Sequence, residues 1–156
     1  MKYYLAYASN LNKEEMENRC SSAKALGTAV LEDYQLAFCR HATIVKEPGA
    51  YVPVGVWQID EECEKMLDRY EGYPHYYTKE TVSIEFEGKE IEALIYMMNK
   101  EHANFRLPHS DYLDDVTRGY IDFNFKVFDL FSALQYTKNA IENKKVFYWF
   151  SPEKSE

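Results

Sequence analysis

Three observations predict an α+β fold for this sequence of 156 residues. Strand-like patterns dominate the middle of the chain, helical patterns follow from Pro108 onward, and long helices between successive strands are missing. Strands grouped before helices are typical of an α+β domain with a largely antiparallel sheet, which in this case could also close into a barrel. The sequence contains no internal repeat, linker or low-complexity tract, so we expect a single domain over residues 1–156.

The N-terminal segment predicts a strand and then a short helix. Residues 2–7 form a short run rich in aromatic residues, which is typical of a buried strand. Asn12, followed by Glu15 three positions later, has the pattern of a capping box for a helix that runs to about Cys20.

The next stretch is expected to contain several short strands. Residues 28–45 predict two or three strands with a turn at residues 32–33. Residues 47–49, Glu-Pro-Gly, give a second turn signal, because proline fixes φ and glycine permits the chain to reverse. Residues 53–59 then predict another strand.

A helix is expected over residues 61–70, with Asp60 as its N-cap. Gly72 and Pro74 are expected to end it. Apolar side chains at helical spacing predict its buried face: Cys63, Met66, Leu67 and Tyr70.

The C-terminal half predicts a hairpin and two helices. Apolar residues alternate in both arms of residues 76–98, around a turn at residues 87–89. Ser110 is expected to cap one helix, and residues 126–143 predict a longer one. The final aromatic run, residues 146–150, is either a late strand or an aromatic plug.

Composition and charge exclude several classes of protein. With 46% hydrophobic and 28% charged residues, the chain is globular rather than disordered. No apolar run approaches the length of a membrane span, and the first residues lack the pattern of a signal peptide. The net charge of −8 disfavours nucleic acid as a partner, because its phosphates require a basic surface. We therefore expect a cytoplasmic protein with neither a membrane nor a nucleic-acid partner.

Cysteine and histidine spacing argues against disulfides and metal. The three cysteines, Cys20, Cys39 and Cys63, are odd in number and widely spaced, which fits reduced thiols in a cytosol better than a disulfide framework. The four histidines are scattered and form no HExxH or comparable pattern, so we expect no metal site.

A polar loop after the first strand is the first candidate site. It consists of Tyr7, Ala8, Ser9, Asn10 and Leu11. Where a strand ends and a helix begins, successive backbone N–H groups can hold a carboxylate or a developing oxyanion. The alternative is a simple connection in which Ser9 and Asn10 satisfy local backbone groups, and the residues alone favour this alternative because such loops are common.

Glu71 is the candidate acid–base residue. It is placed at the C-terminal end of its predicted helix, where the macrodipole disfavours a carboxylate. Aromatic neighbours could desolvate the carboxyl and raise its pKa, which suits a general base near neutral pH. These neighbours are Tyr70, Tyr73, Tyr76 and Tyr77. The alternative is a solvated surface glutamate, which is the commoner case when Glu71 is taken alone.

Tyr112, at the start of a late helix, could donate a hydrogen bond to a substrate. Its spacing to Leu113 and Val116 equally supports a tyrosine of the helix core. No Ser–His–Asp order, nucleophile elbow or glycine-rich phosphate loop is present in the sequence.

Four blocks of the sequence follow one another along the chain: YASNL at 7–11, ATIVKEPGAYVPVGVWQI at 42–59, LDRYEGYPHYY at 67–77 and PHSDYLDDVTRGYIDF at 108–123. They resemble the signatures of the γ-glutamylcyclotransferase family. Those signatures are Tyr-Gly-Ser-Asn-Leu, a Pro-Gly turn before a Val-Gly-Val strand, Leu-Asp-x-x-Glu-Gly, and Pro-Ser-x-x-Tyr with a glycine seven residues later. Four blocks in this order make the resemblance strong and extend it over nearly the whole chain.

The resemblance implies a small mixed β-barrel flanked by helices, and a reaction without a cofactor or metal. In that reaction the α-amine of a γ-glutamyl group attacks its own γ-amide carbonyl, which forms 5-oxoproline and releases an amine or amino acid. By motif match, Glu71 would be the acid–base residue. The loop at residues 7–11 would bind the γ-glutamyl portion, largely through backbone groups, and Tyr112 would contact the substrate.

The sequence departs from the family pattern at two positions. Ala8 replaces the signature glycine, and its Cβ would crowd a ligand and restrict the backbone if φ had to be positive. His109 stands where the family often has serine, although Ser110 could take that role. Two interpretations therefore remain: an active cyclotransferase, or a weakly active or inactive member that binds a small metabolite or a protein partner in the same cavity. Neither the leaving amine nor the oligomeric state can be deduced from the sequence.

Overall fold

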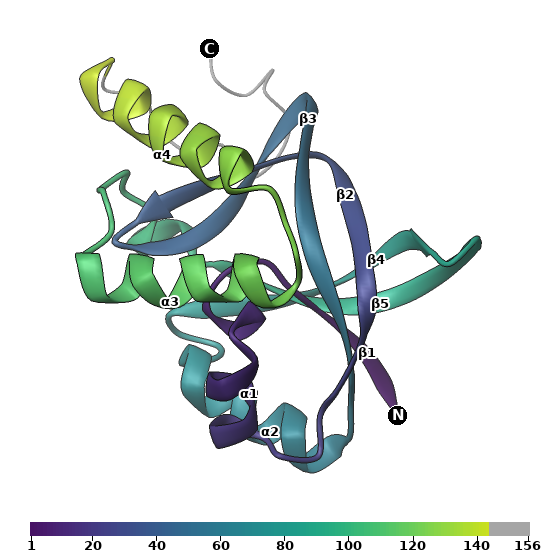
Figure 1. The fold of residues 1–156 in the computed structure, drawn as a ribbon. Helices are drawn as coiled ribbons and strands as arrows, with labels where there is room; N and C mark the ends of the chain where they lie inside the picture. Colours follow the sequence, from purple (N-terminus) through teal and green to yellow (C-terminus); the bar gives the residue numbers. More distant parts are fainter. Residues whose placement is uncertain (144–156) are drawn as a thin grey trace.

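A computed structural model describes residues 1–143, so the aromatic run at residues 146–150 lies outside the described residues. The strands are β1 (Lys2–Ala6), β2 (Lys24–Cys39), β3 (His41–Ile59), β4 (Tyr77–Phe86) and β5 (Lys89–Met98). The helices are α1 (Lys13–Arg19), α2 (Glu61–Glu71), α3 (Ser110–Asp122) and α4 (Val127–Glu142), with 3₁₀ turns η1 (Ser9–Leu11) and η2 (Lys100–His102) (Figure 1). None of these helices is both long and apolar enough to cross a membrane.

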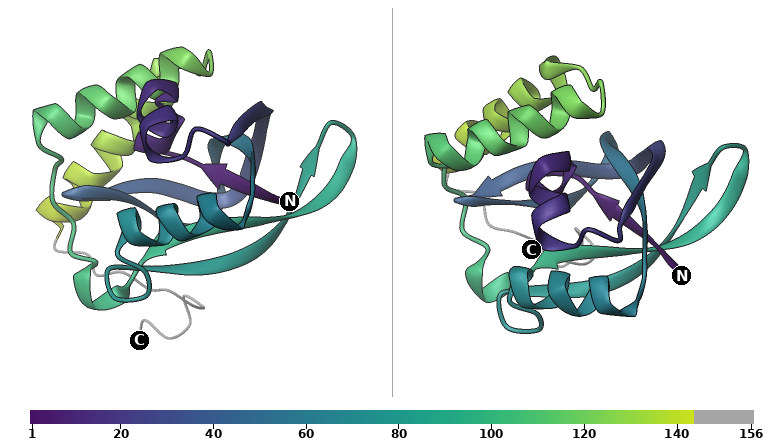
Figure 2. Two further views of the ribbon diagram at one scale, coloured as in Figure 1. Left: turned by 90° about the horizontal axis from the view of Figure 1, so that it is seen from below. Right: turned by 60° about the horizontal axis from the view of Figure 1, so that its bottom comes forward.

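The strands form one mixed sheet in the order β2-β3-β1-β5-β4. Neighbouring strands are antiparallel except β1 and β5, which are parallel. Helices α3 and α4 lie together on one side of the sheet and α2 lies on the other (Figure 2). The predicted α+β class and largely antiparallel sheet are therefore confirmed.

The predicted barrel is not confirmed, because the sheet is open and its two edge strands, β2 and β4, are not paired with each other. The edges do approach at one point. A Cβ built on Gly27 of β2 would lie 3.2 Å from the ring of Phe86 at the end of β4. The Phe86 ring thus contacts β2 without a backbone ladder between the two edge strands, and the β4–β5 hairpin extends away from the body of the protein (Figure 1).

The two or three short strands predicted over residues 28–45 are instead parts of two long, bent strands. The predicted turns at residues 32–33 and 47–49 are irregularities within them, with φ values of 64° at Asp33 and 87° at Gly49. The Gly49 N–H donates to Asp33 Oδ1 at 3.0 Å. The two segments predicted as turns are therefore hydrogen-bonded to each other across the β2–β3 ladder. The chain actually reverses at Arg40, with φ of 71°, between β2 and β3.

Helix α2 begins and ends close to the predicted positions. The Asp60 carboxylate accepts a hydrogen bond from the Cys63 N–H at 2.7 Å, and left-handed Gly72 follows Glu71. Its buried face is narrower than predicted, because Cys63 and Leu67 are buried whereas Met66 and Tyr70 are 43% and 45% exposed. The exposed Tyr70 ring is covered in part by the Arg19 guanidinium, 3.6 Å from its centroid.

The expectation of reduced thiols is wrong for two of the three cysteines. Cys20, directly after α1, forms a disulfide with Cys63 of α2. Sequence spacing gave no sign of this pair, because the two residues are 43 positions apart and meet only through the packing of the two helices. The disulfide removes the cysteine argument for a reducing compartment. Cys39 remains a free, buried thiol.

Helix α3 packs directly onto the turn η1. A Cβ built on Gly119 would lie 2.5 Å from the Leu11 Cβ, so only glycine permits this approach. The predicted cap of this helix is wrong, since His109 occupies the N-cap position and Ser110 is the first helical residue. The close contact is what holds the loop after β1 against the body of the protein.

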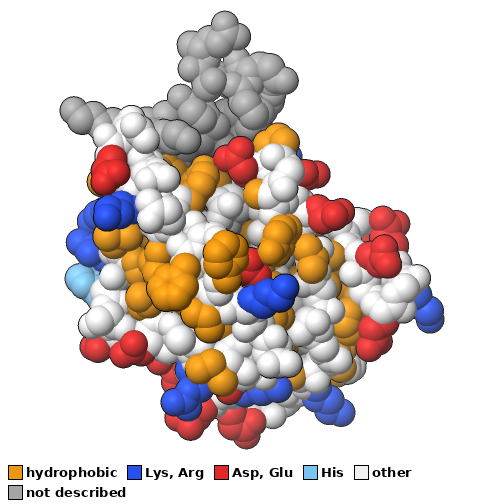
Figure 3. All heavy atoms as spheres, turned by 45° about the horizontal axis from the view of Figure 1, so that its top comes forward, with side chains coloured by type: hydrophobic (Ala, Val, Ile, Leu, Met, Phe, Trp, Pro, Cys, Tyr) orange, Lys and Arg blue, Asp and Glu red, His pale blue; other side chains and the backbone are white. Residues whose placement is uncertain are grey.

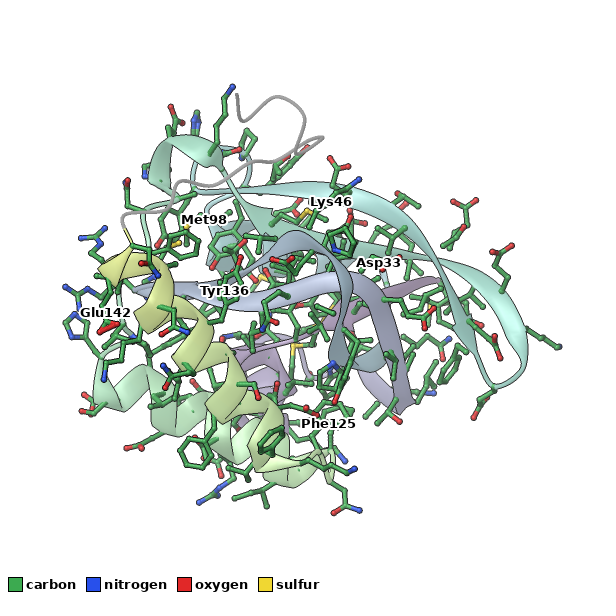
Figure 4. The ribbon with its side chains drawn as sticks, turned by 90° about the horizontal axis from the view of Figure 1, so that it is seen from above. Asp33, Lys46, Met98, Phe125, Tyr136 and Glu142 are labelled. Carbon is green, nitrogen blue, oxygen red and sulfur yellow. A yellow bond between two sulfur atoms is a disulfide. The ribbon has the colours of Figure 1, made fainter. Side chains whose placement is uncertain are left out.

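Helix α4 packs against β2 and leaves an apolar outer surface. The Phe38 N–H of β2 donates to Thr137 Oγ1 at 3.0 Å. The hydroxyl of Tyr136, which is labelled in Figure 4, donates to Glu47 of β3. Large apolar side chains nevertheless remain exposed at Phe128 and Phe131 of α4 and at Ile121 of the neighbouring α3. Apolar side chains also gather on the face seen in Figure 3.

Candidate active site

Two adjoining cavities lie where β1 and α2 end. The walls of both include Ser9, Glu71, Tyr77 and Tyr112. The inner cavity has a volume of about 20 Å³ and is also lined by Tyr4, Tyr7, Ala8, Asn10, Ala42 and Tyr96. The outer cavity has a volume of about 150 Å³ and is also lined by His41, Tyr70 and Tyr76. The structure thus brings most of the sequence-predicted site residues together.

The loop after β1 supplies one wall. Tyr7, Ala8, Ser9 and Asn10 line the inner cavity, whereas the buried Leu11 side chain packs toward α3 and is not part of the lining. Within η1 the N–H groups of Leu11 and Asn12 donate to the carbonyls of Ala8 and Ser9. The N–H groups of Ser9 and Asn10 stay outside these bonds, as in the first turn of any helix. The loop can therefore offer backbone donors to an anionic or carbonyl oxygen.

Ala8 does not occupy the left-handed region that favours glycine. Its φ is −142°, and its ψ of −118° lies outside the usual α and β regions. The buried alanine adds a methyl group to the cavity wall instead. The departure from the signature glycine thus reduces the space for a ligand at this wall.

Glu71 is the last residue of α2 and belongs to the walls of both cavities. Desolvation raises the pKa of its carboxyl from 4.5 to about 7, and the positive charge of Arg19 partly opposes this shift. No group within residues 1–143 donates a hydrogen bond to the carboxylate. Glu71 is therefore able to take up and release a proton near neutral pH.

Three tyrosines bind the backbone around the inner cavity. The Tyr7 hydroxyl donates to the carbonyl of Tyr96 at 2.7 Å, and the Tyr77 hydroxyl donates to the carbonyl of Ala42. The Ala42 N–H in turn donates to the Tyr112 hydroxyl at 3.0 Å. Burial raises the pKa of all three phenols, so they are neutral hydrogen-bonding groups at physiological pH.

Aromatic rings form the outer cavity. The Tyr76 hydroxyl lies 2.8 Å from His41 Nδ1, and the Tyr70 hydroxyl lies 3.3 Å from Ser9 Oγ. Burial lowers the pKa of His41, which favours its neutral form. The cavity therefore presents ring surfaces to a ligand together with the Glu71 carboxyl and the Ser9 and Tyr112 hydroxyls.

A hydrogen-bonded chain connects the loop to α1. Arg19 Nη1 donates to Asn10 Oδ1 at 2.6 Å, and Nη2 donates to Glu15 at 3.2 Å. Asn10 Nδ2 donates to the Tyr4 hydroxyl at 2.8 Å. The same guanidinium lies over the Tyr70 ring, so Arg19 contacts both sides of the site.

Sequence reasoning found the loop, Glu71 and Tyr112, but it missed several residues of the site. The missed residues are Tyr4, Arg19, His41 and Tyr96. Tyr4 had the pattern of a core strand residue, and nothing in the order of the chain links it to Asn10. The ring of Tyr73, which was expected beside Glu71, instead contacts the Lys79 ammonium, 4.3 Å from the ring centroid. Neither His109 nor Ser110 lines either cavity.

Other regions offer less chemistry. A larger cavity of about 410 Å³ lies over β3, β4 and β5, with Lys46, Glu80 and Met98 in its wall, and none of the predicted site residues lines it (Figure 4). Within the described part of the chain, no group of three or more His, Cys, Asp or Glu side chains is arranged to hold a metal ion.

Comparison with known proteins identifies relatives of this chain. The family model described as "Gamma-glutamyl cyclotransferase, AIG2-like" matches residues 4–114. The chain is 34% identical to human "Gamma-glutamylcyclotransferase" over 115 residues, which cover 64% of this chain and 61% of that protein. It is 33% identical over 109 residues to the protein of the same name from Bos taurus, covering 61% and 58%. The chain thus spans about three fifths of the length of these curated relatives.

Solved structures give the same picture. A structure titled "Gamma-glutamyl cyclotransferase" superposes with a TM-score of 0.70 at 26% identity, covering 97% of this chain and 94% of that one. A human protein described as uncharacterized superposes with a TM-score of 0.69 at 27% identity, covering 88% and 85%. The likeness to solved structures therefore extends well beyond the segment that the family model matches.

Proposed function

Because the chain belongs to the gamma-glutamyl cyclotransferase, AIG2-like family, we propose that it is a γ-glutamylcyclotransferase. Its substrate is a γ-glutamyl amide, and its products are 5-oxoproline and a free amine or amino acid. The observation that carries the proposal is the Glu71 carboxyl, which is desolvated, has a pKa of about 7 and belongs to the walls of both cavities.

The reaction needs three proton transfers and no redox step. The α-ammonium of the γ-glutamyl group loses a proton to Glu71, and the freed amine attacks the γ-carbonyl carbon. The ring nitrogen then still carries two protons, and it releases one of them to water to become the lactam N–H. The carbonyl electron pair moves to oxygen and returns as the bond to the leaving nitrogen breaks. That nitrogen takes the proton back from Glu71. Because nucleophile and electrophile belong to one molecule, positioning and proton transfer supply most of the rate.

The loop after β1 supports the positioning step. Backbone N–H groups of Ser9 and Asn10 are available to a carboxylate or to the developing oxyanion of the substrate. Tyr112, whose hydroxyl already accepts the Ala42 N–H, contributes a further polar group at the boundary of the two cavities. We assign the γ-glutamyl portion to this region.

The outer cavity is assigned to the leaving amine. It adjoins the inner cavity at Glu71, which is where the departing nitrogen must receive its proton. Its walls include the rings of Tyr70, Tyr76 and His41, and ring surfaces favour alkyl or aromatic groups over strongly hydrated ones.

The test is the release of 5-oxoproline from a panel of γ-glutamyl amino acids and γ-glutamyl amines. We expect at least one class to be cyclised, with full activity after dialysis against a strong chelator. Activity that is lost on dialysis and restored by zinc or magnesium would contradict the metal-free mechanism. If no member of the panel is cyclised while isothermal titration shows that γ-glutamyl compounds bind, the chain is a binding member of the family and not a cyclotransferase.

A further inference from the structure

The hydrogen bonds around Asn10 have a fixed direction. A guanidinium can only donate, so the side-chain atom of Asn10 that lies 2.6 Å from Arg19 Nη1 must be the carbonyl oxygen, Oδ1. The amide nitrogen therefore faces Tyr4, and it donates to the Tyr4 hydroxyl at 2.8 Å. Because the Tyr4 oxygen accepts in this bond, its own O–H hydrogen stays available for another acceptor.

The Tyr4 hydroxyl lies in the inner cavity. Tyr4 is only 3% exposed and shares the wall of this cavity with Glu71, whose carboxylate raises the pKa of the phenol. Within residues 1–143, no protein group accepts a hydrogen bond from this hydroxyl. A buried donor without an acceptor is costly unless a ligand or water supplies one.

The other tyrosines of the inner cavity are engaged differently. Tyr7 and Tyr77 donate to backbone carbonyls, and Tyr96 donates to Asp68 Oδ1 at 2.6 Å. Tyr112 accepts the Ala42 N–H, and the Ser9 side chain is a second hydrogen-bond partner beside it. Among these tyrosines, Tyr4 and Tyr112 each accept a hydrogen bond and have no acceptor among the described residues. Tyr4 differs from Tyr112 in lining the inner cavity alone and in being linked through Asn10 to the Arg19 guanidinium.

We propose that Tyr4 is a further catalytic residue, whose hydroxyl donates a hydrogen bond to the γ-carbonyl oxygen of the substrate as that oxygen gains negative charge. Arg19 and Asn10 are positioning residues that act through Tyr4. This inference rests on the proposed function, because the oxyanion exists only if the ring closure takes place.

The step is balanced without a proton transfer from Tyr4. When the α-amine forms the new C–N bond, the carbonyl electron pair moves to oxygen, and the Tyr4 O–H strengthens its hydrogen bond to that charge. Burial holds the pKa of Tyr4 well above its ordinary value, so the proton stays on the phenol. The electron pair returns when the leaving amine departs with the proton from Glu71. The positive charge of Arg19, transmitted through Asn10, polarises the hydroxyl toward the oxyanion.

The first experiment compares Tyr4→Phe with Tyr3→Phe. Loss of one oxyanion donor typically lowers kcat by about 10²–10³-fold, so we expect that loss in Tyr4→Phe with little change in KM. Tyr3 precedes it in β1, is partly exposed and packs its ring edge-on to Phe86, so Tyr3→Phe is the matched control and should keep wild-type kcat. Thermal melting of both variants establishes that they fold.

The second experiment reverses the hydrogen bond at Asn10. In Asn10→Asp both carboxylate oxygens accept, so the Tyr4 O–H turns to the aspartate and away from the cavity, while Arg19 keeps its partner. We expect Asn10→Asp to lower kcat about as far as Tyr4→Phe does, and to have less than a threefold effect when Tyr4 is already phenylalanine. Such non-additivity is the signature of two residues that act as one unit.

The outcomes separate the two hypotheses. If the wild type releases 5-oxoproline and Tyr4→Phe stays within threefold of its kcat, the role of Tyr4 is overturned and the proposed function stands. If the losses in Tyr4→Phe and Asn10→Asp multiply in the double variant, Asn10 does not act through Tyr4 and the chain of positioning residues is overturned. If the wild type cyclises no γ-glutamyl compound, the proposed function fails and this inference fails with it.

Discussion

The two elements that meet at the inner cavity differ in how completely their polar groups are satisfied. The loop after β1 is almost entirely buried, and its Asn10 and Asn12 side chains are both hydrogen-bonded, Asn10 to Arg19 and Tyr4, and Asn12 to the N–H of Glu15. At the end of α2, by contrast, Glu71 has a desolvated carboxyl with no hydrogen-bond donor among the described residues. The loop side of the site is therefore held in place by hydrogen bonds. The α2 side carries the Glu71 carboxyl, whose desolvation lowers the stability of the fold when it is charged.

The difference fits the roles proposed for the two sides. A binding surface gains from being fixed before the ligand arrives, because less conformational freedom is then lost on binding. A general base gains from having no protein donor, because a hydrogen-bonded carboxylate would have a low pKa and would hold no proton to return. The following variants test whether the loop side serves binding and the α2 side serves proton transfer, beginning with the largest expected effect.

The disulfide joins α1 to α2, since Cys20 follows α1 and Cys63 lies in α2. Helix α1 is in turn connected to the loop through the hydrogen bond from Arg19 to Asn10. In the chain-entropy account, a crosslink between residues 43 positions apart stabilises the fold by about 4 kcal/mol. We expect reduction to lower the free energy of unfolding by an amount of that order, measured by urea titration with and without a reductant. A Cys63→Ser variant that is insensitive to the reductant is the control. An unfolding midpoint unaffected by reductant in the wild type would contradict the prediction.

Glu71→Gln tests the reactive side. The amide is nearly isosteric but cannot accept and return a proton, so we expect turnover to fall at least about a hundredfold while the fold and substrate binding are kept. Asp68→Asn is the matched control on the same helix, because Asp68 only accepts the Tyr96 hydroxyl and pairs with Lys79. Near-normal turnover in folded Glu71→Gln would remove Glu71 from the mechanism.

The same variant should be more stable than the wild type at alkaline pH. The carboxyl has a pKa of about 7 in the folded protein against 4.5 ordinarily, so the unfolded chain binds fewer protons between these values and wild-type stability falls as pH rises from 4.5 to 7. Glu71→Gln lacks this loss and should gain up to about 3 kcal/mol at pH 8 relative to pH 4. Equal stability differences at both pH values would show that the carboxyl is not desolvated.

Gly119→Ala tests the loop side, because Gly119 of α3 packs against Leu11 of the loop. Helix propensity alone predicts a stabilisation of about 1 kcal/mol for glycine to alanine inside a helix. Here the new Cβ would meet Leu11 at 2.5 Å, so we expect a destabilisation of about 1–3 kcal/mol instead. The sign of the change in melting temperature decides between the two, and a rise would mean that α3 does not fix the loop.

Local rules predicted much of the fold and part of the site. The Asn12 and Asp60 caps, the end of α2 at Gly72 and the β4–β5 hairpin all follow from a few neighbouring residues. The errors arose where distant segments decide the outcome. Asp33 and Gly49 bond to each other across a ladder rather than turning the chain, and Cys20 meets Cys63 only after two helices pack. Tyr4 escaped notice although its partner Asn10 is close in the sequence, because the bond between them depends on how the loop after β1 turns back toward the strand.

The division of the site into two cavities also matters for protein engineering. His41, Tyr70 and Tyr76 line the outer cavity and not the inner one, and they come from three separate segments of the chain. Tyr70 is also held by the Ser9 side chain and the Arg19 guanidinium, so replacing it would disturb the loop. A small library confined to the His41 and Tyr76 codons would vary the space proposed for the leaving amine without replacing a side chain that contacts the loop. Selectivity for the leaving amine could then be altered separately from the proposed proton transfer.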